Sequence, residues 1–283
     1  MPDDTAVLRY AAFTDDPAGG NPAGVVLDAS ALDDATMQAI AVDVGYSETA
    51  FVTGRGDTGD LHVRYFSPEA EVPFCGHATI ATGVAWGHAH GFGALRLHTP
   101  AGLVAVEVVP GDPPVATLTS VAPRSLPVAA VDLAEALAAL RWDATELDPA
   151  LPPRSAFAGA WHLVLATATP ARLADLDYDF DRLKALMAAR DWTTLQLVHR
   201  EAPGAFRARN PFPPGGVVED PATGAAAAAL GGYLRELGLV KAPARVTISQ
   251  GADMGRPSLL TVEVPAGADS GIRVSGAAVP IAT

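Results

Sequence analysis

Three side chains in this sequence have the chemistry of an acid–base centre, namely Glu48, His77 and Asp220. Glu48 is the only charged residue in the otherwise uncharged segment 45–52. A carboxyl group that is buried in an apolar site has a raised pKa, which suits proton transfer near neutral pH. The alternative is a glutamate at a strand edge that faces water, and the pattern alone leaves both interpretations open.

His77 and Asp220 each lie where a helix is expected to begin, after Gly76 and before Pro221. A histidine in such a place can shuttle a proton or donate to an oxygen of a ligand. The alternative for His77 is a helix N-cap whose ring packs in the core. The alternative for Asp220 is an ordinary N-cap aspartate, the commonest reason for that residue type at a helix start.

The elements that must position these residues come from two similar segments about 145 residues apart, 73–81 and 219–227. Each is a turn marked by Gly and Pro that leads directly into an Ala-rich helical stretch. The first turn of a helix has unpaired N–H groups and the positive end of the helix dipole, so it attracts anions. We therefore expect two lobes whose helix starts bind one small acidic ligand.

Hydrophobic periodicity and turn residues predict the remaining elements. The helix at 77–90 is apolar nearly all round, so we expect it to be buried on every side. Residues 110–128 are rich in proline and predict a connector with one strand. We expect strands at 7–13, 24–27, 49–53, 61–66, 94–98, 103–108, 161–167, 195–199, 205–208, 245–249, 259–264 and 272–275, and helices at 33–44, 77–90, 133–140, 170–175, 180–189 and 222–237.

The predicted fold class is α+β, with two similar lobes that are each a β-barrel-like sheet wrapped around a central apolar helix. The expected N-terminal lobe is 1–118, to which the C-terminal strand at 271–283 returns, and the expected C-terminal lobe is 119–270. A chain of 283 residues is long enough for two such lobes, and its hydrophobic content of 49% is typical of a well-packed globule.

The net charge of −13 argues against nucleic acid and anionic membrane surfaces as partners. The single cysteine, Cys75, excludes an intrachain disulfide, and we expect it to be a small buried residue although a thiol at a helix start can have a lowered pKa. The first residues show no signal-peptide pattern, so a cytoplasmic protein is expected.

Other motifs carry weaker signals. Segments 21–22 and 213–216 predict turns, and 250–258 predicts a loop whose Arg256 could bind a carboxylate. His88 and His90 are two residues apart at a helix end, which is a poor spacing for metal ligands. No dinucleotide fingerprint, phosphate loop or nucleophile elbow is present. We expect no metal and no cofactor.

Taken together, the motifs resemble those of the phenazine-biosynthesis PhzF-like isomerases, a branch of the diaminopimelate-epimerase-like fold. The resemblance spans nearly the whole chain and keeps the order and spacing of five motifs. They are Gly20-Asn21-Pro22-Ala23, Ser47-Glu48-Thr49-Ala50-Phe51, Cys75-Gly76-His77-Ala78-Thr79, Glu219-Asp220-Pro221-Ala222-Thr223-Gly224, and Gln250-Gly251 with Met254-Gly255-Arg256-Pro257-Ser258.

This resemblance implies two lobes with the active site in the cleft between them, and a homodimer. It implies that Glu48 moves a proton, that His77 and Asp220 orient and polarise the substrate, and that no cofactor takes part. The best-known member isomerises trans-2,3-dihydro-3-hydroxyanthranilate. The residues expected to bind a substrate carboxylate or to line its site are Gly76, Gly224, Ala225, Asn21 and Arg256.

Two departures from the family pattern matter. Ala225 stands where the family often has serine, which removes a hydroxyl contact and puts the phenazine substrate in question. The epimerase branch uses two cysteines, and the partner position of Cys75 is expected near Pro221, so two-thiol epimerisation is not supported. The alternatives to an isomerase are a non-catalytic small-carboxylate-binding protein on the same fold, or a hydrolase or lyase that uses the same carboxylate.

Overall fold

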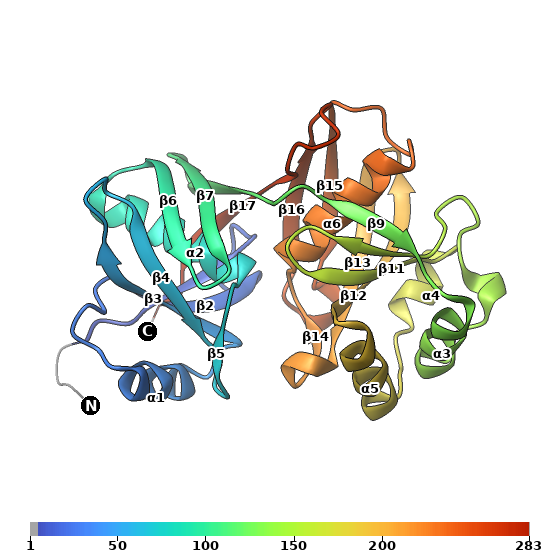
Figure 1. Cartoon of the computed structure of the whole chain (residues 1–283), viewed down its shortest axis with the longest axis horizontal. Coiled ribbons are helices and arrows are strands. Elements are labelled where there is room, and N and C mark those ends of the chain that lie inside the picture. The colour runs from blue at the N-terminus through green and yellow to red at the C-terminus, as the bar shows by residue number, and fades with distance from the viewer. Residues whose placement is uncertain (1–4, 283) are drawn as a thin grey trace. The chain divides into compact units, whose positions relative to one another are not determined.

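The computed structural model describes residues 5–282, which divide into two compact units. The first unit contains the described residues up to Thr119 together with those from Ser275 onward, and the second contains Ser120–Val274. Both mix strands and helices, so the predicted α+β class is confirmed (Figure 1). Within residues 5–282, no helix has both the length and the apolar composition needed to cross a membrane.

The first unit is a closed barrel around one helix. Strand pairs run in the order β1, β2, β3, β4, β6, β7, β8 and β17, and β17 pairs with β1 to close the ring. The elements are β1 Leu8–Ala12, β2 Asn21–Val26, α1 Asp34–Val44, β3 Glu48–Arg55, β4 Leu61–Phe66, β5 Glu71–Val72, α2 Gly76–His90, β6 Gly93–Thr99, β7 Gly102–Val109, β8 Val115–Thr119 and β17 Arg273–Pro280.

The second unit repeats this plan. Its strands pair in the order β9, β10, β11, β12, β13, β15 and β16, with the same alternation of antiparallel and parallel neighbours. The elements are β9 Arg124–Pro127, α3 Ala130–Leu140, η1 Ala144–Glu146, β10 Arg154–Phe157, β11 Trp161–Ala166, α4 Pro170–Ala174, α5 Phe180–Arg190, β12 Trp192–Ala202, β13 Ala205–Phe212, η2 Pro213–Gly215, β14 Val217–Asp220, α6 Gly224–Glu236, β15 Ala244–Gln250, η3 Ala252–Met254 and β16 Ser258–Val264.

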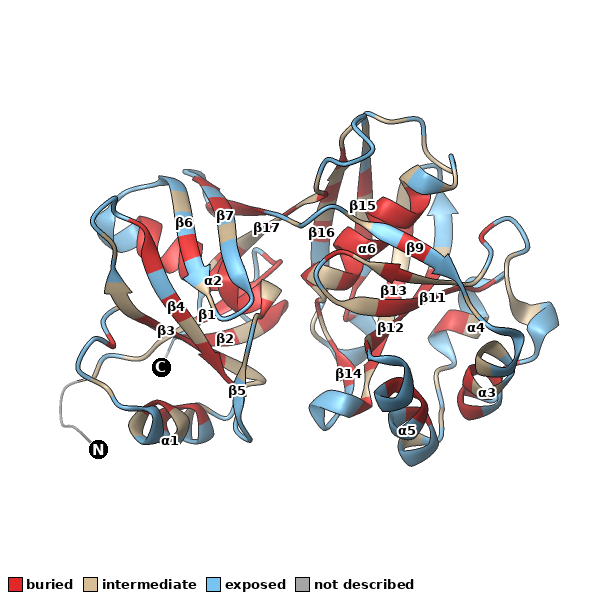
Figure 2. Cartoon of the chain, viewed as in Figure 1, coloured by how far each residue is buried: buried red, intermediate tan, exposed pale blue. Residues whose placement is uncertain are grey.

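The helices α2 and α6 form the centres of the two units. Every residue of α2 from His77 to Gly87 is buried, as its apolar composition predicts (Figure 2). Helix α6 packs against β9, β10, β11, β12 and β16. Small residues make this close packing possible: a Cβ added at Gly231 would lie 2.8 Å from Val262 and 2.9 Å from Ile272. The predicted repeat of a buried helix inside strands is confirmed.

Several local predictions are wrong. Residues 110–128 hold two strands, β8 and β9, rather than one. The short strands β5, β10 and β14 were not predicted, because each has at most four residues and lacks an apolar alternation. The segment Asn21-Pro22 is not a turn but begins β2. Pro is tolerated there because it occupies the second residue of the strand, near its end.

Candidate active site

The first unit brings Glu48 and His77 together. Glu48 is the first residue of β3 and pairs with Ala23 of β2, and His77 is the second residue of α2. Glu48 Oε2 lies 3.4 Å from His77 Nε2, and their side chains are 12% and 6% exposed. The structure therefore excludes the water-facing alternative for Glu48. It places a carboxyl group and an imidazole in one buried pair.

Burial raises the pKa of the Glu48 carboxyl above its ordinary value, because the charged form loses its hydration. Hydrogen bonds with the side chains of Ser47 and Cys75 act in the opposite direction and favour the charged form. The outcome is a raised pKa, so the carboxyl can both hold and release a proton nearer neutral pH than an exposed glutamate can.

The orientation of the Asn21 amide selects the tautomer of His77. The Asn21 amide nitrogen lies 3.0 Å from His77 Nδ1, and since an amide nitrogen only donates, Nδ1 accepts. The proton of the neutral ring then lies on Nε2, which faces the Glu48 carboxyl and lies 3.4 Å from Ser47 Oγ. The N-cap of α2 is Cys75, so the prediction of His77 as a cap is wrong, whereas its ring is buried. Cys75 itself is buried, as predicted.

We expect Glu48 to make the stability of the protein depend on pH. Because its folded pKa is raised, the protonated carboxyl persists in the folded state above pH 4.5, where it ionises in the unfolded chain. The folded state then binds more protons, so the free energy of unfolding falls as the pH rises until the folded pKa is passed. Urea unfolding should show this fall relative to Glu48→Gln as the pH rises above 4.5, whereas parallel curves would contradict it.

Asp220 lies in the second unit at the end of β14, where it pairs with Asn210 of β13. It is 7% exposed, and its Oδ2 accepts a hydrogen bond of 2.5 Å from Thr223 Oγ1. The N-cap of α6 is Thr223, so the N-cap interpretation of Asp220 is wrong. Asp220 instead lies three residues before the cap, and α6 begins two residues later than predicted.

Gln250, the last residue of β15, holds the turn between Asp220 and α6. Its Nε2 donates to the Asp220 carbonyl oxygen at 2.8 Å and to Thr223 Oγ1 at 3.1 Å, and its Oε1 accepts from Thr223 N at 3.3 Å. The next residue, Gly251, has φ +76°, and a Cβ there would lie 2.6 Å from the Pro221 carbonyl oxygen. Glycine is therefore required for the close approach of these two loops.

We expect Gln250→Leu to lower kcat/KM by about tenfold, because the turn between Asp220 and α6 loses its three hydrogen bonds to Gln250. A displaced site group lowers the rate by up to about 100-fold. It should also cost about 1–3 kcal/mol of stability, since polar groups are left unsatisfied. The matched control is Gln196→Leu, which removes another buried glutamine of the same unit. If both variants lose stability but keep their kcat/KM, Gln250 has only a structural role.

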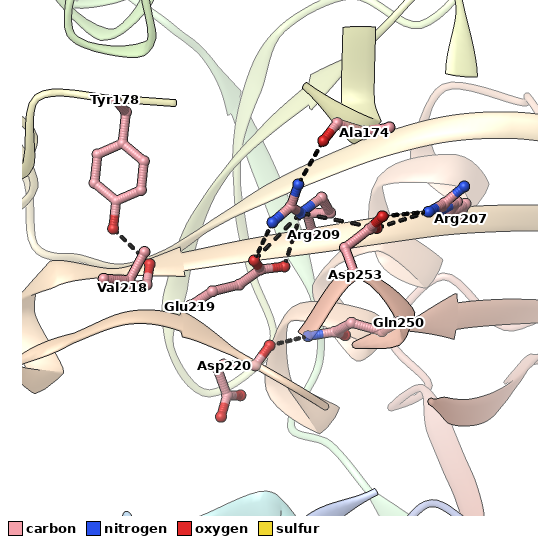
Figure 3. Close-up of polar contacts among 9 residues, drawn as sticks. All are labelled: Ala174, Tyr178, Arg207, Arg209, Val218, Glu219, Asp220, Gln250 and Asp253. Carbon is pink, nitrogen blue, oxygen red and sulfur yellow. Dashed lines mark hydrogen bonds and ion pairs between the residues drawn. The ribbon is translucent and has the colours of Figure 1, made fainter. Parts of the chain in front are cut away.

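A buried ion pair anchors the strand that carries Asp220. Arg209 binds the Glu219 carboxylate through Nε at 3.0 Å and through Nη2 at 2.5 Å, and it also donates to the Ala174 carbonyl oxygen. The Arg209 and Glu219 side chains are 11% and 4% exposed. Figure 3 shows the Asp220 carboxylate pointing away from this pair. The pair therefore fixes the backbone of β14 without binding that carboxylate.

The two central helices begin in equivalent ways, which identifies equivalent residues of the two units. The N-caps are Cys75 and Thr223, and the first helical residues are Gly76 and Gly224, so His77 corresponds to Ala225. Thr223, not Pro221, thus stands in the place of Cys75, and no second thiol exists in the sequence. In the described part of the chain, neither N-cap side chain bonds to an amide of its helix.

Each unit holds its own share of the predicted residues. Asn21 joins His77, whereas Arg256 follows the short helix η3 and its backbone N–H donates to the Gly251 carbonyl oxygen. From the sequence, Gln250 is recognised only as part of a family motif and has no predicted role, and the pair of Arg209 with Glu219 is not predicted. The signal that indicates a role for Gln250 is a polar residue at the end of a strand, directly before glycine.

Glu48, Cys75 and His77 are also the side chains that could hold a metal ion. Within residues 5–282 they form the only group of three whose ligand atoms all lie within 4.8 Å of one another. His88 and His90 belong to the last turn of α2, as predicted, and are not in such a group.

Comparisons with known proteins agree with this fold. Residues 10–283 match the family model described as phenazine biosynthesis-like protein. An uncharacterised isomerase of Bacillus subtilis is 30% identical, over 96% of this chain and 95% of its own. The trans-2,3-dihydro-3-hydroxyanthranilate isomerase of Pseudomonas chlororaphis is 32% identical, over 93% and 91%. A Bacillus anthracis PhzF-family structure, 24% identical, covers 98% of this chain and 96% of its own with a TM-score of 0.87.

The fold and these relatives define an isomerase of the diaminopimelate-epimerase-like fold. Within that class, the chain belongs to the phenazine biosynthesis-like family, whose model it matches over nearly its whole length. The family resemblance noted in the sequence is thereby confirmed.

Proposed function

We propose that the protein moves a proton between carbon atoms of a small carboxylate-bearing metabolite, without a cofactor, by acid–base catalysis at Glu48. The observation that carries this proposal is the buried Glu48 carboxyl group 3.4 Å from His77 Nε2. Its raised pKa and the proton on Nε2 supply both a proton acceptor and a hydrogen-bond donor in one place.

The proposed reaction has two proton transfers. The ionised Glu48 carboxylate takes a proton from a substrate carbon beside an electron-withdrawing group, and the C–H electron pair enters the conjugated system. The same carboxyl group then returns a proton to another carbon, which regenerates the carboxylate. His77 Nε2–H donates to the developing negative charge or to Glu48, and Asn21 keeps it in the donating tautomer.

We further propose that backbone N–H groups at the two helix starts bind the substrate carboxylate, from Gly76 in the first unit and from Gly224 and Ala225 in the second. The absence of a side-chain cap on either helix, among the described residues, supports this role. Asp220 would orient the substrate, and Arg256 would bind a carboxylate oxygen. The family resemblance supports the proposal that residues of both units act on one substrate.

The first substrate to test is trans-2,3-dihydro-3-hydroxyanthranilate, because one relative at 32% identity bears its name. Ala225 lacks the hydroxyl that the family often has at this place, so we propose a related carboxylate as the second candidate class. The homodimer that the resemblance implies remains a prediction, as does the cytoplasmic location expected from the lack of a signal-peptide pattern.

The test is incubation of the purified protein with this compound, followed by chromatography and mass spectrometry. An isomerase converts it into a product of unchanged mass, whereas a hydrolase adds the mass of water and a lyase produces fragments. If the compound binds, as measured by calorimetry, but is recovered unchanged, the non-catalytic binding protein is the better description. Conversion with a change of mass contradicts the proposal directly.

We expect turnover to survive removal of divalent metal. Each proposed step is a proton transfer between Glu48 and a substrate carbon, and no step requires a Lewis acid. Dialysis against a chelator, followed by desalting, should not lower kcat or raise KM. Loss of turnover that a single metal species restores would show that the group of Glu48, Cys75 and His77 works as a metal centre instead.

A further inference from the structure

The three buried side chains of the acid–base centre also have the composition of a zinc site. Glu48, Cys75 and His77 supply a carboxylate oxygen, a sulfur and an imidazole nitrogen, all within 4.8 Å of one another. We propose that they bind Zn²⁺, or a cation of similar softness, and that this cation occupies the acid–base centre and inhibits it. The inhibition rests on the proposed function, whereas the binding does not.

Two distances among the donors are close to those around a tetrahedral zinc ion. Bonds of about 2.3 Å to sulfur and about 2.0 Å to nitrogen or oxygen place sulfur about 3.5 Å from nitrogen, and nitrogen about 3.3 Å from oxygen. Here Cys75 Sγ lies 3.7 Å from His77 Nε2, and Glu48 Oε2 lies 3.4 Å from the same nitrogen. Because Cys75 Sγ also lies 3.3 Å from Nδ1, the thiol must rotate about its Cα–Cβ bond to face a cation on Nε2.

Charge and softness decide which cation fits. The site is buried, with Glu48 at 12%, His77 at 6% and Cys75 at 7% exposure, so a charge placed there must be compensated. A carboxylate and a thiolate together offset the two charges of a divalent cation. A thiolate and an imidazole favour Zn²⁺ over Mg²⁺ and Ca²⁺, which prefer oxygen ligands.

Asn21 can support the metal-bound form of His77. When Nε2 binds the cation, the ring proton moves to Nδ1, which then needs an acceptor. The Asn21 amide lies 3.0 Å from Nδ1, and a half turn of that amide presents its oxygen in place of its nitrogen. Such an outer partner for the second ring nitrogen is usual for histidine ligands of zinc.

The test measures binding of the metal alone to chelator-treated full-length protein. Zn²⁺ is titrated in competition with a chromophoric chelator, and Co²⁺ is added separately to look for a thiolate-to-cobalt charge-transfer band. We expect one equivalent of Zn²⁺ and a cobalt band in the wild type. Cys75→Ala should abolish the band, and Cys75→Ala and His77→Gln should each weaken Zn²⁺ binding more than about tenfold, since losing an outer partner alone costs that much.

The control is His98→Ala, which removes an exposed histidine that pairs with Asp60 at 2.9 Å elsewhere in the unit. It should leave both signals unchanged. Absence of binding, or binding that Cys75→Ala and His77→Gln leave intact, would overturn the proposal. Because no substrate is present, failure here says nothing against the isomerase. Conversely, a bound cation that does not slow turnover would overturn only the inhibition.

Discussion

Glu48→Gln is expected to lower kcat by about 10²- to 10⁴-fold, the range that a positioned general acid–base group contributes. The amide has nearly the shape of the carboxyl group, so packing beside His77 is preserved. It cannot, however, accept a proton from carbon at any ordinary pH. KM should change little, because the proposed carboxylate contacts come from helix amides rather than from Glu48. Steady-state kinetics on the first converted substrate gives both numbers.

The matched control for this variant is Glu71→Gln in the same unit. Glu71 pairs with Arg64 at 2.7 Å and is 34% exposed, so its loss removes a charge without touching the acid–base pair. Glu71→Gln should retain wild-type kcat, and circular dichroism should show both variants folded. Glu48→Gln with most of the wild-type rate would mean that Glu48 is not the acid–base group.

Glu219→Ala is expected to cost about 3 kcal/mol of stability, because removing one partner of a buried ion pair takes the main counter-ion from the other charge. Arg209 would then keep its charge at 11% side-chain exposure, with the Ala174 carbonyl oxygen and the more distant Asp253 carboxylate, 4.0 Å from Nε, as remaining partners. The double variant Arg209→Met with Glu219→Ala should regain part of that loss, since no buried charge is left. Urea unfolding of the three proteins measures both effects.

An exposed ion pair of the same unit provides the comparison. Arg245 and Glu263 lie 3.3 Å apart with side chains 70% and 37% exposed, and pairs of this kind contribute little. Arg245→Ala should therefore leave the free energy of unfolding nearly unchanged. Equal losses for Glu219→Ala and Arg245→Ala would show that burial does not determine the importance of the Arg209–Glu219 pair.

The central helices could be predicted from the sequence because their signals are local. A glycine-marked turn followed by small apolar residues predicts a buried helix, and both α2 and α6 have that form. The meeting of Glu48 with His77 could not be obtained from spacing. It depends on the parallel pairing of β2 with β3 and on the position of α2 inside the barrel, which are long-range features.

The second unit was harder to predict for the same physical reason. Strand β14 has only four residues, and its sequence Val-Val-Glu-Asp lacks the alternation of a half-buried strand. Its charged Glu219 is buried because Arg209, ten residues earlier, compensates it. Likewise, Gln250 lies next to Asp220 only because β15 pairs with β13 beside β14. Pair interactions of this kind are invisible to any pattern that treats residues one at a time.

The most direct test of proton transfer at Glu48 is proton NMR in deuterium oxide, with trans-2,3-dihydro-3-hydroxyanthranilate and with related small carboxylates as substrates. The account predicts an isomer of the substrate with deuterium at the reacting carbon, and no such incorporation with Glu48→Gln. Isomerisation that proceeds equally in Glu48→Gln would contradict Glu48 as the acid–base group. Conversion in which both proteins only transfer the substrate's own proton, with no deuterium entering at carbon, would contradict it as well.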